Sequence, residues 1–206
     1  MDEFTYWVNG EFVPESQATV PLNSRGYRLG DGIFDTERTF DGRIFRLDAH
    51  MQRLARSLAY TRISLGMSLD ELAQVSEETV RRNEHLRERH GDFWVTQTVS
   101  RQDEGAFVSV IVEPLPAIRM APLFAEGLSL SVPAVRSNGS SGLDPKVKAT
   151  SRLGMVLADL ETKTTDPNAW TLLLDDAGDL TEVLFGNLFL ARDGKLLTPP
   201  VRAILS

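Results

Sequence analysis

The sequence predicts an α+β protein made of two units. In the first half, turn signals separate strand-like runs, and residues with helical spacing follow. After a proline-rich break, the sequence again predicts strands and a helix. With 42% hydrophobic and 25% charged residues, the composition is typical of a globular protein. We expect a small N-terminal α+β domain at 1–113, a linker at 114–122 and a second domain at 123–206.

Two hairpins are expected in the first domain. Asn9-Gly10 and Asp41-Gly42 each separate two strand-like runs, and such dipeptides favour tight turns because both positions accept positive φ. The expected strands are 6–8 and 11–13 around the first turn, and 33–40 and 43–47 around the second.

Two helices and two further strands complete the first domain. Met51, Leu54 and Leu58 have helical spacing, and Ser68 with Glu71 forms a capping box that begins a helix running to about Leu86. Alternating apolar residues predict strands at 93–99 and 107–112.

The second domain begins after three prolines in 114–122, which favour extended chain because proline lacks a backbone donor. We expect a strand at 128–135, a flexible loop at 138–142, a helix from about 151 to 163, and strands at 170–174, 187–191 and 195–197. The domain is small for a stable core and stops in an apolar run at 201–206. The sequence therefore looks truncated.

Composition excludes several classes of function. Without cysteine there is no disulfide, no cysteine-ligated zinc and no thiolate nucleophile, and the three histidines lack the spacing of a helical metal site, so no metal is expected. The net charge of -7 disfavours nucleic acid and anionic membranes as partners. No apolar stretch is long enough to span a bilayer and the N-terminus does not resemble a signal peptide, so we expect a cytoplasmic protein.

Four lysines are candidates for amine chemistry. Lys163 ends a predicted helix and Lys195 follows a tight turn, so both are expected to be solvated. Lys146 and Lys148 end an extended run and, two residues apart, project to the same side. The spacing leaves open which of the two is buried, and two solvated loop lysines remain the alternative.

Three other features have both a functional and an ordinary interpretation. Glu182 is an isolated acid among apolar residues, which is costly unless a partner binds it, although a strand edge facing water would also explain it. Arg53 has the position of an ordinary surface arginine on a helix. Gly30-x-Gly32 lacks the third glycine and the following helix of a phosphate loop, so a turn before a strand is expected.

Four blocks in order resemble one family. RGYRLGDGIFDTERTF, FRLDAHMQRL, DPKVKATSRLGMVLADLE and LLLDDAGDLTEVLFGNLFLARDGKLLTPP are similar to the fold-type IV pyridoxal-phosphate enzymes, the class IV aminotransferases. The family includes branched-chain and D-amino-acid transaminases, (R)-selective amine transaminases and aminodeoxychorismate lyase. The resemblance implies a small N-terminal domain, a larger mixed-sheet or barrel C-terminal domain that is incomplete here, a homodimer, and pyridoxal 5'-phosphate as cofactor.

The resemblance also implies roles for single residues. Lys148 matches the lysine that bonds to the cofactor and moves the substrate proton, and Glu182 matches the acid that pairs with the pyridine nitrogen. Arg53 matches the arginine that holds the phosphate. Asn187 matches an asparagine beside the cofactor, and Arg152 stands where it can reach the ring hydroxyl. Members of the family continue past Leu205 with a turn whose backbone donates to the phosphate, and this chain ends before that turn.

The candidate substrate residues are Phe34, which matches the position where the family has an aromatic lining the substrate pocket, and Arg38 or Arg101, which are candidates for binding the substrate carboxylate. The expected reaction moves an amino group from an amino acid or amine to a 2-oxo acid, and DGRIFRLDAH and DPKVK favour the D-amino-acid or (R)-amine type. A branched-chain L-amino-acid transaminase is an alternative. Arg152 favours aminodeoxychorismate lyase as another, and a non-catalytic binding module on the same scaffold is a third.

Overall fold

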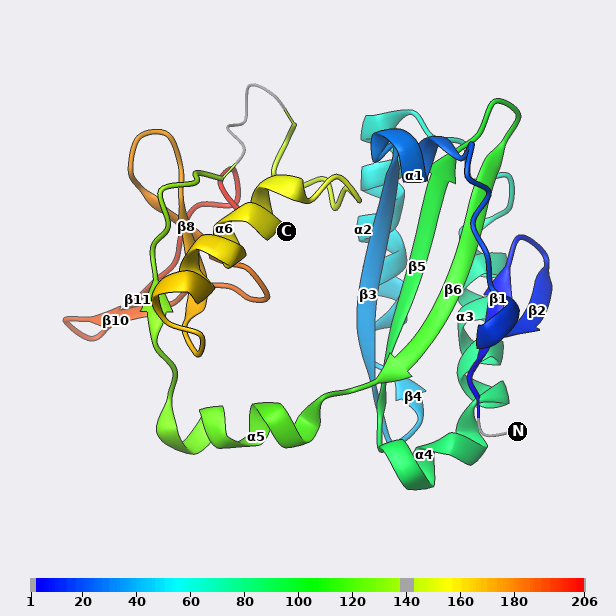
Figure 1. Cartoon of the computed structure of the whole chain (residues 1–206), viewed down its shortest axis with the longest axis horizontal. Helices are drawn as coiled ribbons and strands as arrows, with labels where there is room; N and C mark the ends of the chain where they lie inside the picture. Colours follow the sequence, from blue (N-terminus) through cyan, green and yellow to red (C-terminus); the bar gives the residue numbers. More distant parts are fainter. Residues whose placement is uncertain (1–2, 138–142, 206) are drawn as a thin grey trace. The chain divides into compact units, whose positions relative to one another are not determined.

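The computed structural model describes residues 3–137 and 143–205, so the loop expected at 138–142 lies outside the described residues. The chain forms two compact units (Figure 1). The first unit contains Met1–Pro116 together with the short segment Lys148–Ser151, and the second contains Ala117–Val147 and Arg152–Ser206. A four-residue piece of the later sequence therefore belongs to the earlier unit.

A six-stranded antiparallel sheet forms the centre of the first unit, in the order β2-β1-β6-β5-β3-β4. Its strands are β1 Thr5–Val8, β2 Glu11–Pro14, β3 Gly32–Phe40, β4 Arg43–Ile44, β5 Phe93–Arg101 and β6 Ala106–Pro114. The three long strands β3, β5 and β6 lie next to one another, so the middle of the sheet is also its longest part.

Helices pack against one face of this sheet and bury its core. The helical segments of the unit are η1 Glu15–Gln17, α1 Arg25–Leu29, α2 Leu47–Thr61, α3 Leu69–Arg82 and α4 Glu84–His90. α2 packs on β3, and α3 packs on β1, β5 and β6. Leu54 of α2, Leu72 of α3 and Val95, Val99, Val110 and Val112 of the sheet have no exposed surface. Burial of these apolar side chains stabilises the unit.

The local signals for turns and caps are confirmed. Asn9 and Asp41 both have positive φ, at 53° and 50°, and each joins an antiparallel pair of strands. The capping box of Ser68 and Glu71 is present at the start of α3. The strand expected at 43–47 is shorter, because the chain turns into the left-handed region at Arg46 and begins α2.

The helix predicted to run to about Leu86 instead ends at Arg82, and α4 begins after one residue. Asn83 at this break is completely buried. Its Oδ1 accepts a hydrogen bond from Thr5 N, and its Nδ2 donates to the carbonyls of Thr5 and Thr79. These bonds to β1, which is distant in sequence, fix the break, and local helical spacing carries no sign of them.

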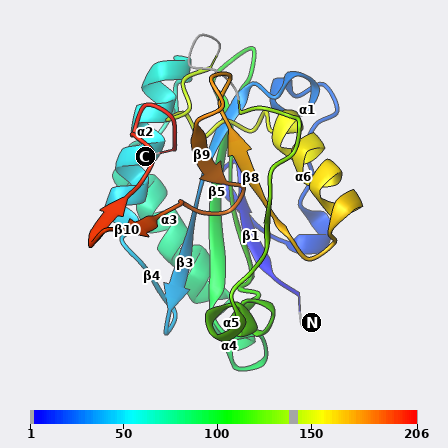
Figure 2. The same cartoon turned by 90° about the vertical axis from the view of Figure 1, so that its left-hand side faces the viewer.

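Within 117–137, 143–147 and 152–205, the second unit combines two helices with two small sheets. Its elements are α5 Ala117–Glu126, β7 Leu130–Ser131, α6 Leu153–Thr165, β8 Trp170–Leu174, β9 Leu180–Val183, β10 Leu190–Arg192 and β11 Lys195–Leu197. β8 is central to a three-stranded sheet, parallel to β7 and antiparallel to β9. Figure 2 shows β8 and β9 next to each other. β10 and β11 form a separate hairpin, as the turn at Asp193-Gly194 predicts.

Several expectations for the second unit need correction. The segment expected as extended linker contains α5, with Pro122 inside it, because the surrounding alanine, methionine and leucine residues favour helix. The strand expected at 128–135 is only two residues long, and the strand expected at 187–191 begins at Leu190. None of the helices within the described residues is long and apolar enough to cross a membrane.

Candidate functional site

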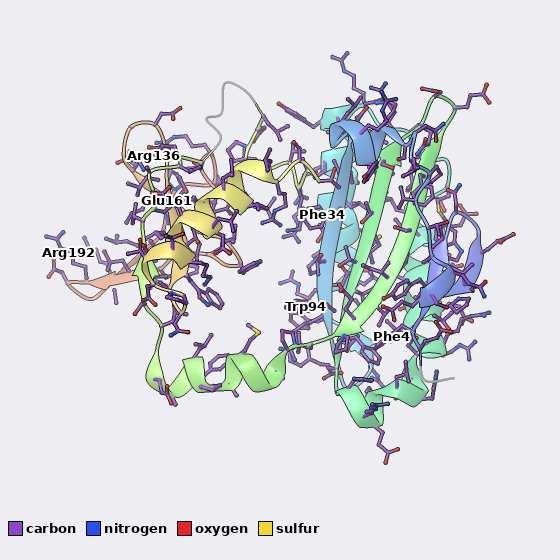
Figure 3. All side chains as sticks on the ribbon, viewed as in Figure 1. Phe4, Phe34, Trp94, Arg136, Glu161 and Arg192 are labelled. Carbon is purple, nitrogen blue, oxygen red and sulfur yellow. The ribbon has the colours of Figure 1, made fainter. Side chains whose placement is uncertain are left out.

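The two faces of β3 have different chemistry. Side chains alternate along a strand, and the residues that face α2 and α3 are Ile33, Asp35, Glu37 and Thr39, all buried. Phe34, Thr36 and Arg38 lie on the opposite face, which we call the Phe34 face. Trp94 of β5 pairs with Arg38 and belongs to this face, as Figure 3 shows with Phe34 and Trp94 on the same side of the sheet.

The segment Lys148–Ser151 adds to the outer edge of β3. Phe34 N donates to Lys148 O and Thr150 N donates to Gly32 O, both at 2.9 Å, and Ile33 and Ala149 form an antiparallel bridge. This register sets Lys148 opposite Phe34, so the two side chains leave the sheet on the same face. Lys148 Nζ lies 4.6 Å from the centre of the Phe34 ring.

The structure distinguishes the two neighbouring lysines. Lys146 is exposed, Val147 is buried, and Lys148 is half-buried with its backbone N donating to Ser57 Oγ of α2 at 3.3 Å. Lys148 is therefore held in place by both β3 and α2. The sequence spacing alone leaves these two lysines equivalent.

The glycine turn before β3 makes room for this segment. Gly30 has a φ of 64°, and a Cβ there would lie 3.0 Å from Ser151 Cβ. A Cβ on Gly32 would lie 3.2 Å from Thr150 Oγ1 and 3.1 Å from Val99 O. Thr150 Oγ1 is also within 3.1 Å of the carbonyl oxygens of both glycines. The turn expected at Gly30-x-Gly32 is present, and its glycines permit the close approach of Lys148–Ser151, which we call the lysine segment.

Arg101 has a structural environment. Its Nε lies 3.1 Å from Asp31 Oδ2, and its Nη1 and Nη2 donate to the carbonyls of Arg62 and Thr61 at the end of α2. Asp31 is also paired with Arg25 at 2.8 Å. All the guanidinium nitrogens of Arg101 thus have protein partners, which leaves Arg38 as the better placed candidate for a substrate carboxylate.

Arg38 lies on the Phe34 face near the far end of β3. Its guanidinium carbon is 3.8 Å from the centre of the Phe40 ring, and its Nε donates to Thr39 O at 3.2 Å. Phe34 and Arg38 are four residues apart, so their Cα atoms are separated by about 13 Å along the strand. Between them, the hydroxyls of Thr36 and Thr96 are hydrogen-bonded at 2.9 Å.

A buried polar cluster lies behind the Phe34 face, between β3, β5 and α2. We define it as Asp35, Glu37, His50, Arg53 and Gln97. Asp35 has no exposed surface, and its carboxylate accepts hydrogen bonds from Arg53 Nε at 2.7 Å and from His50 Nδ1 at 2.9 Å. Burial alone would raise the pKa of Asp35, but the hydrogen bonds from Arg53 and His50 hold it below its ordinary value. Asp35 is therefore ionised at neutral pH.

Glu37 behaves differently from Asp35. Burial raises the pKa of its carboxyl from 4.5 to about 7, although Gln97 Nε2 donates to Oε1 at 2.5 Å. Its Oε2 is buried, has no hydrogen-bond partner in the part of the chain that the structure describes, and lies 3.8 Å from His50 Nδ1. Asp35, Glu37 and His50 are close enough to share a cation, but Arg53 already binds both oxygens of Asp35, so we assign no metal to this cluster.

Arg53 fits the role of an anion ligand. Its Nε and Nη2 bind the two oxygens of Asp35, and within the described residues Nη1 has no protein partner. The side chain is 23% exposed. The hydrogen bond to Asp35 raises the pKa of Arg53, so the group stays cationic. One edge of the guanidinium is therefore bound to protein, and the other edge is suited to a phosphate.

The remaining candidate residues belong to the second unit. Arg152 immediately precedes α6, and its Nη2 donates to Leu184 O at 3.4 Å. Burial lowers the pKa of Arg152, while the charge of Glu182 opposes this shift, so the two side chains attract each other. Glu182 on β9 also accepts a hydrogen bond from Leu205 N at 3.3 Å. Asn187 is exposed in the loop between β9 and β10.

The motifs of the sequence do not point to Asp31, Asp35 or Thr150. Asp31 and Thr150 hold the glycine turn and the lysine segment, and Asp35 holds Arg53. A signal for Asp35 exists in the alternation of β3, because Asp35 and Glu37 share the period of the apolar Ile33 and so must be buried. Two acids on the buried face of a strand require partners.

The sequence of the chain is similar to those of known proteins. A family model described as class IV amino-transferase matches residues 32–206. The chain is 34% identical to the "Putative branched-chain-amino-acid aminotransferase" of Methanocaldococcus jannaschii over 199 residues, which cover 95% of this chain and 68% of that protein. It is 27% identical to the D-alanine aminotransferase of Staphylococcus haemolyticus over 200 residues, with the same coverage.

Solved structures have the same fold. The branched-chain aminotransferase of Thermoproteus uzoniensis, solved with norvaline, superposes with a TM-score of 0.85 at 27% identity, covering 98% of this chain and 70% of that one. The T.th. branched-chain amino acid aminotransferase, solved with pyridoxamine 5'-phosphate, superposes with a TM-score of 0.88 at 22% identity and the same coverage. The mixed α+β fold thus matches that of these aminotransferases.

Proposed function

The chain belongs to the class IV aminotransferase family, whose members use pyridoxal phosphate, and from that premise we propose the reaction and the residues that perform it here. The proposed reaction moves an amino group from an amino acid or amine to a 2-oxo acid. The observation that carries this proposal is the register of Lys148 with Phe34, which directs a lysine Nζ over an aromatic ring on one face of the sheet.

Each residue has a distinct task in this proposal. The bound cofactor would supply an electron sink for the bond that is broken. Lys148 Nζ would attach the cofactor covalently and carry the proton to and from the substrate carbon. Arg53 would bind the phosphate with the guanidinium edge that Asp35 leaves free. Glu182 would keep the pyridine nitrogen protonated.

The other proposed cofactor contacts come from the second unit. Arg152 would donate to the ring hydroxyl; its side chain is partly buried, and the charge of Glu182 favours its cationic form. Asn187 would lie beside the cofactor. On the substrate side, Phe34 would form a wall of the pocket and Arg38 would bind the carboxylate, with the hydroxyls of Thr36 and Thr96 between them.

For the amino donor, we propose a D-amino acid or an (R)-amine. DGRIFRLDAH and DPKVK support this choice, as does the similarity to D-alanine aminotransferases. A branched-chain L-amino acid is the second candidate, favoured by the relative that is 34% identical. Arg152 favours a third, the elimination catalysed by aminodeoxychorismate lyase. From the family we also infer a cytoplasmic homodimer.

The first experiment tests the role of Lys148. Protein supplied with pyridoxal phosphate should show a visible absorption band, and borohydride should fix the cofactor to Lys148. Lys148→Ala should abolish both results, whereas Lys146→Ala, which removes an exposed lysine two residues away, should leave them unchanged. A band that survives in Lys148→Ala would contradict the assignment.

A second experiment separates the candidate reactions. Loss of the band on adding D-alanine, L-leucine or an (R)-amine identifies the donor, and its return with 2-oxoglutarate shows transfer to an acceptor. A response to L-leucine alone would replace our proposal with the branched-chain assignment. Release of pyruvate from aminodeoxychorismate without any acceptor would replace it with the lyase. Size-exclusion chromatography with light scattering tests the homodimer.

A further inference from the structure

We propose that Asp35 is a positioning residue that holds the Arg53 guanidinium in the orientation required to bind the cofactor phosphate. This inference rests on the proposed role of Arg53 and extends it to a residue that itself touches neither cofactor nor substrate. It is carried by the geometry of the buried polar cluster. The structure provides an arginine with one bound edge, a carboxylate that binds it, and a histidine that fixes the carboxylate.

The contact between Asp35 and Arg53 determines which donors point outward. A guanidinium has five N–H donors arranged in a rigid plane. Nε and Nη2 of Arg53 meet the two oxygens of Asp35 side by side, which fixes the plane as well as the position of the group. With that edge bound, Nη1 and the second N–H of Nη2 remain on the outer edge. Two parallel donors on one edge match two oxygens of a phosphate.

Asp35 is itself held firmly. Its Oδ1 accepts from His50 Nδ1 at 2.9 Å and from Thr36 N at 2.8 Å, in addition to Arg53. The side chain has no exposed surface. Because a ring nitrogen beside an ionised carboxylate must carry a proton, Nδ1 of His50 is the donor in this contact. These bonds hold the carboxylate in one orientation toward Arg53, and the carboxylate in turn fixes the orientation of the guanidinium.

The placement of Arg53 on α2 explains why such a partner matters. Arginine has a long side chain with several rotatable bonds, and binding a ligand with a mobile arginine costs rotamer entropy. In this chain the cost is met during folding, because Asp35 lies on β3 and Arg53 on α2, which pack together in the first unit. The same α2 supplies Ser57, whose hydroxyl accepts from Lys148 N. One helix thus orders both the proposed phosphate ligand and the proposed covalent attachment point.

The experiment compares two forms of the cofactor. Pyridoxal 5'-phosphate and pyridoxal both react with a lysine amine, but only the first has a phosphate, so their affinities separate phosphate binding from every other contact. Dissociation constants for both are measured from the visible band. Asp35→Asn, which keeps the shape and removes the charge, should weaken binding of pyridoxal 5'-phosphate about tenfold or more and that of pyridoxal less than about twofold.

The control variant is Asp92→Asn. Asp92 is also a carboxylate of the first unit that accepts bonds from a side chain and the backbone, namely Thr39 Oγ1 and Gly42 N, but it has no bond to Arg53. It should leave the ratio of the two affinities unchanged. If Asp35→Asn does not fold, His50→Gln removes the ring donor to Asp35 and should lower the same ratio by a smaller factor.

A double substitution tests whether Asp35 acts through Arg53. Arg53→Gln removes the proposed phosphate ligand, so adding Asp35→Asn to it should change the phosphate-dependent affinity by less than about threefold. Full additivity would overturn the inference, as would equal weakening of both cofactor forms in Asp35→Asn. Either result leaves the proposed function intact. If the unsubstituted protein binds neither form at Lys148, the proposed function fails, and the inference fails with it.

Discussion

The two acids on the buried face of β3 show how strongly a protonation state depends on the partners of a single residue. Asp35 and Glu37 are two residues apart and both are buried. Asp35 meets Arg53 and His50 and remains ionised, whereas Glu37 receives one hydrogen bond from the neutral Gln97 and has a pKa near 7. The difference arises because burial disfavours the charged form of both carboxyls, and direct hydrogen bonds from Arg53 and His50 outweigh burial at Asp35 but are missing at Glu37 among the described residues.

Glu37 predicts a pH dependence of stability. Its pKa is about 7 in the folded protein and 4.5 ordinarily, so between these values the folded protein binds more protons than the unfolded chain. Its contribution to the free energy of unfolding is therefore complete below about pH 4.5 and is lost as the pH rises through 7, by at most about 1.4 kcal/mol per pH unit. Glu37→Gln should remove this part of the slope.

The measurement is urea unfolding between pH 5 and pH 8 for the unsubstituted protein and the variant. The free energy of unfolding of Glu37→Gln minus that of the unsubstituted protein should be larger at pH 8 than at pH 5. Glu77→Gln, which replaces an exposed glutamate on α3, serves as the control and should leave the slope unchanged. Equal slopes for Glu37→Gln and the unsubstituted protein would show that Glu37 does not titrate in this range.

At the scale of elements, the turn before β3 and the segment that pairs with it depend on each other. Gly30 ends α1 in the left-handed region, and its missing side chain leaves space for Ser151. The arginines that pair with Asp31 keep this turn in place. The position of Lys148 is thus set by a turn that precedes it by more than a hundred residues.

Gly30→Ala tests this dependence against Gly66→Ala. Both glycines have positive φ, 64° and 79°, so each substitution should cost about 1 kcal/mol of backbone strain. Of these two positions, the new Cβ would meet a neighbour at Gly30, namely Ser151, whereas no described residue lies within 4 Å of the position at Gly66. We expect Gly30→Ala alone to weaken binding of pyridoxal phosphate, by about threefold or more. Matching titrations of the two variants would contradict the role given to Gly30.

Local signals account for much of the fold but not for the elements that distant contacts decide. The Asn9-Gly10 turn, the capping box at Ser68 and the alternation of the long strands are all properties of neighbouring residues, and these predictions are confirmed. The break at Asn83 depends on hydrogen bonds to Thr5. The short β7 likewise depends on a neighbour outside the segment, because it pairs with β8.

At the scale of the whole molecule, the candidate residues are divided between the two units. Phe34, Arg38 and Arg53 belong to the first unit, and Arg152, Glu182 and Asn187 belong to the second. Lys148 comes from the part of the sequence that leads into the second unit but is a member of the first. The family resemblance identifies these residues but does not show which unit each belongs to. The resemblance does not identify Asp35 or the glycine turn, because these position the candidate residues through contacts that are not part of any motif.

Hydrogen exchange would reveal how the returning segment is held. Phe34 N and Thr150 N both bond across the same edge of β3, so their amides should exchange at similar rates. If Lys148 holds the cofactor, adding pyridoxal phosphate should slow both amides about tenfold, since binding stabilises the bound form by mass action. The β1–β2 hairpin at the opposite edge of the sheet is the internal reference and should change little. Slowing of the hairpin alone would contradict the expectation.

The late arrival of residues 148–151 has a consequence during synthesis. Thr150 bonds to Gly30 across 120 positions of sequence, and at about 5–20 residues per second the ribosome needs roughly 6–24 s to cover that distance. During this interval β4 pairs with the last two residues of β3, whereas Gly32 O and Phe34 N near the start of the same edge lack the bonds that they later make to Thr150 and Lys148 and are open to other nascent chains. We therefore expect translation speed and chaperone access to affect the yield of folded protein through the outer edge of β3.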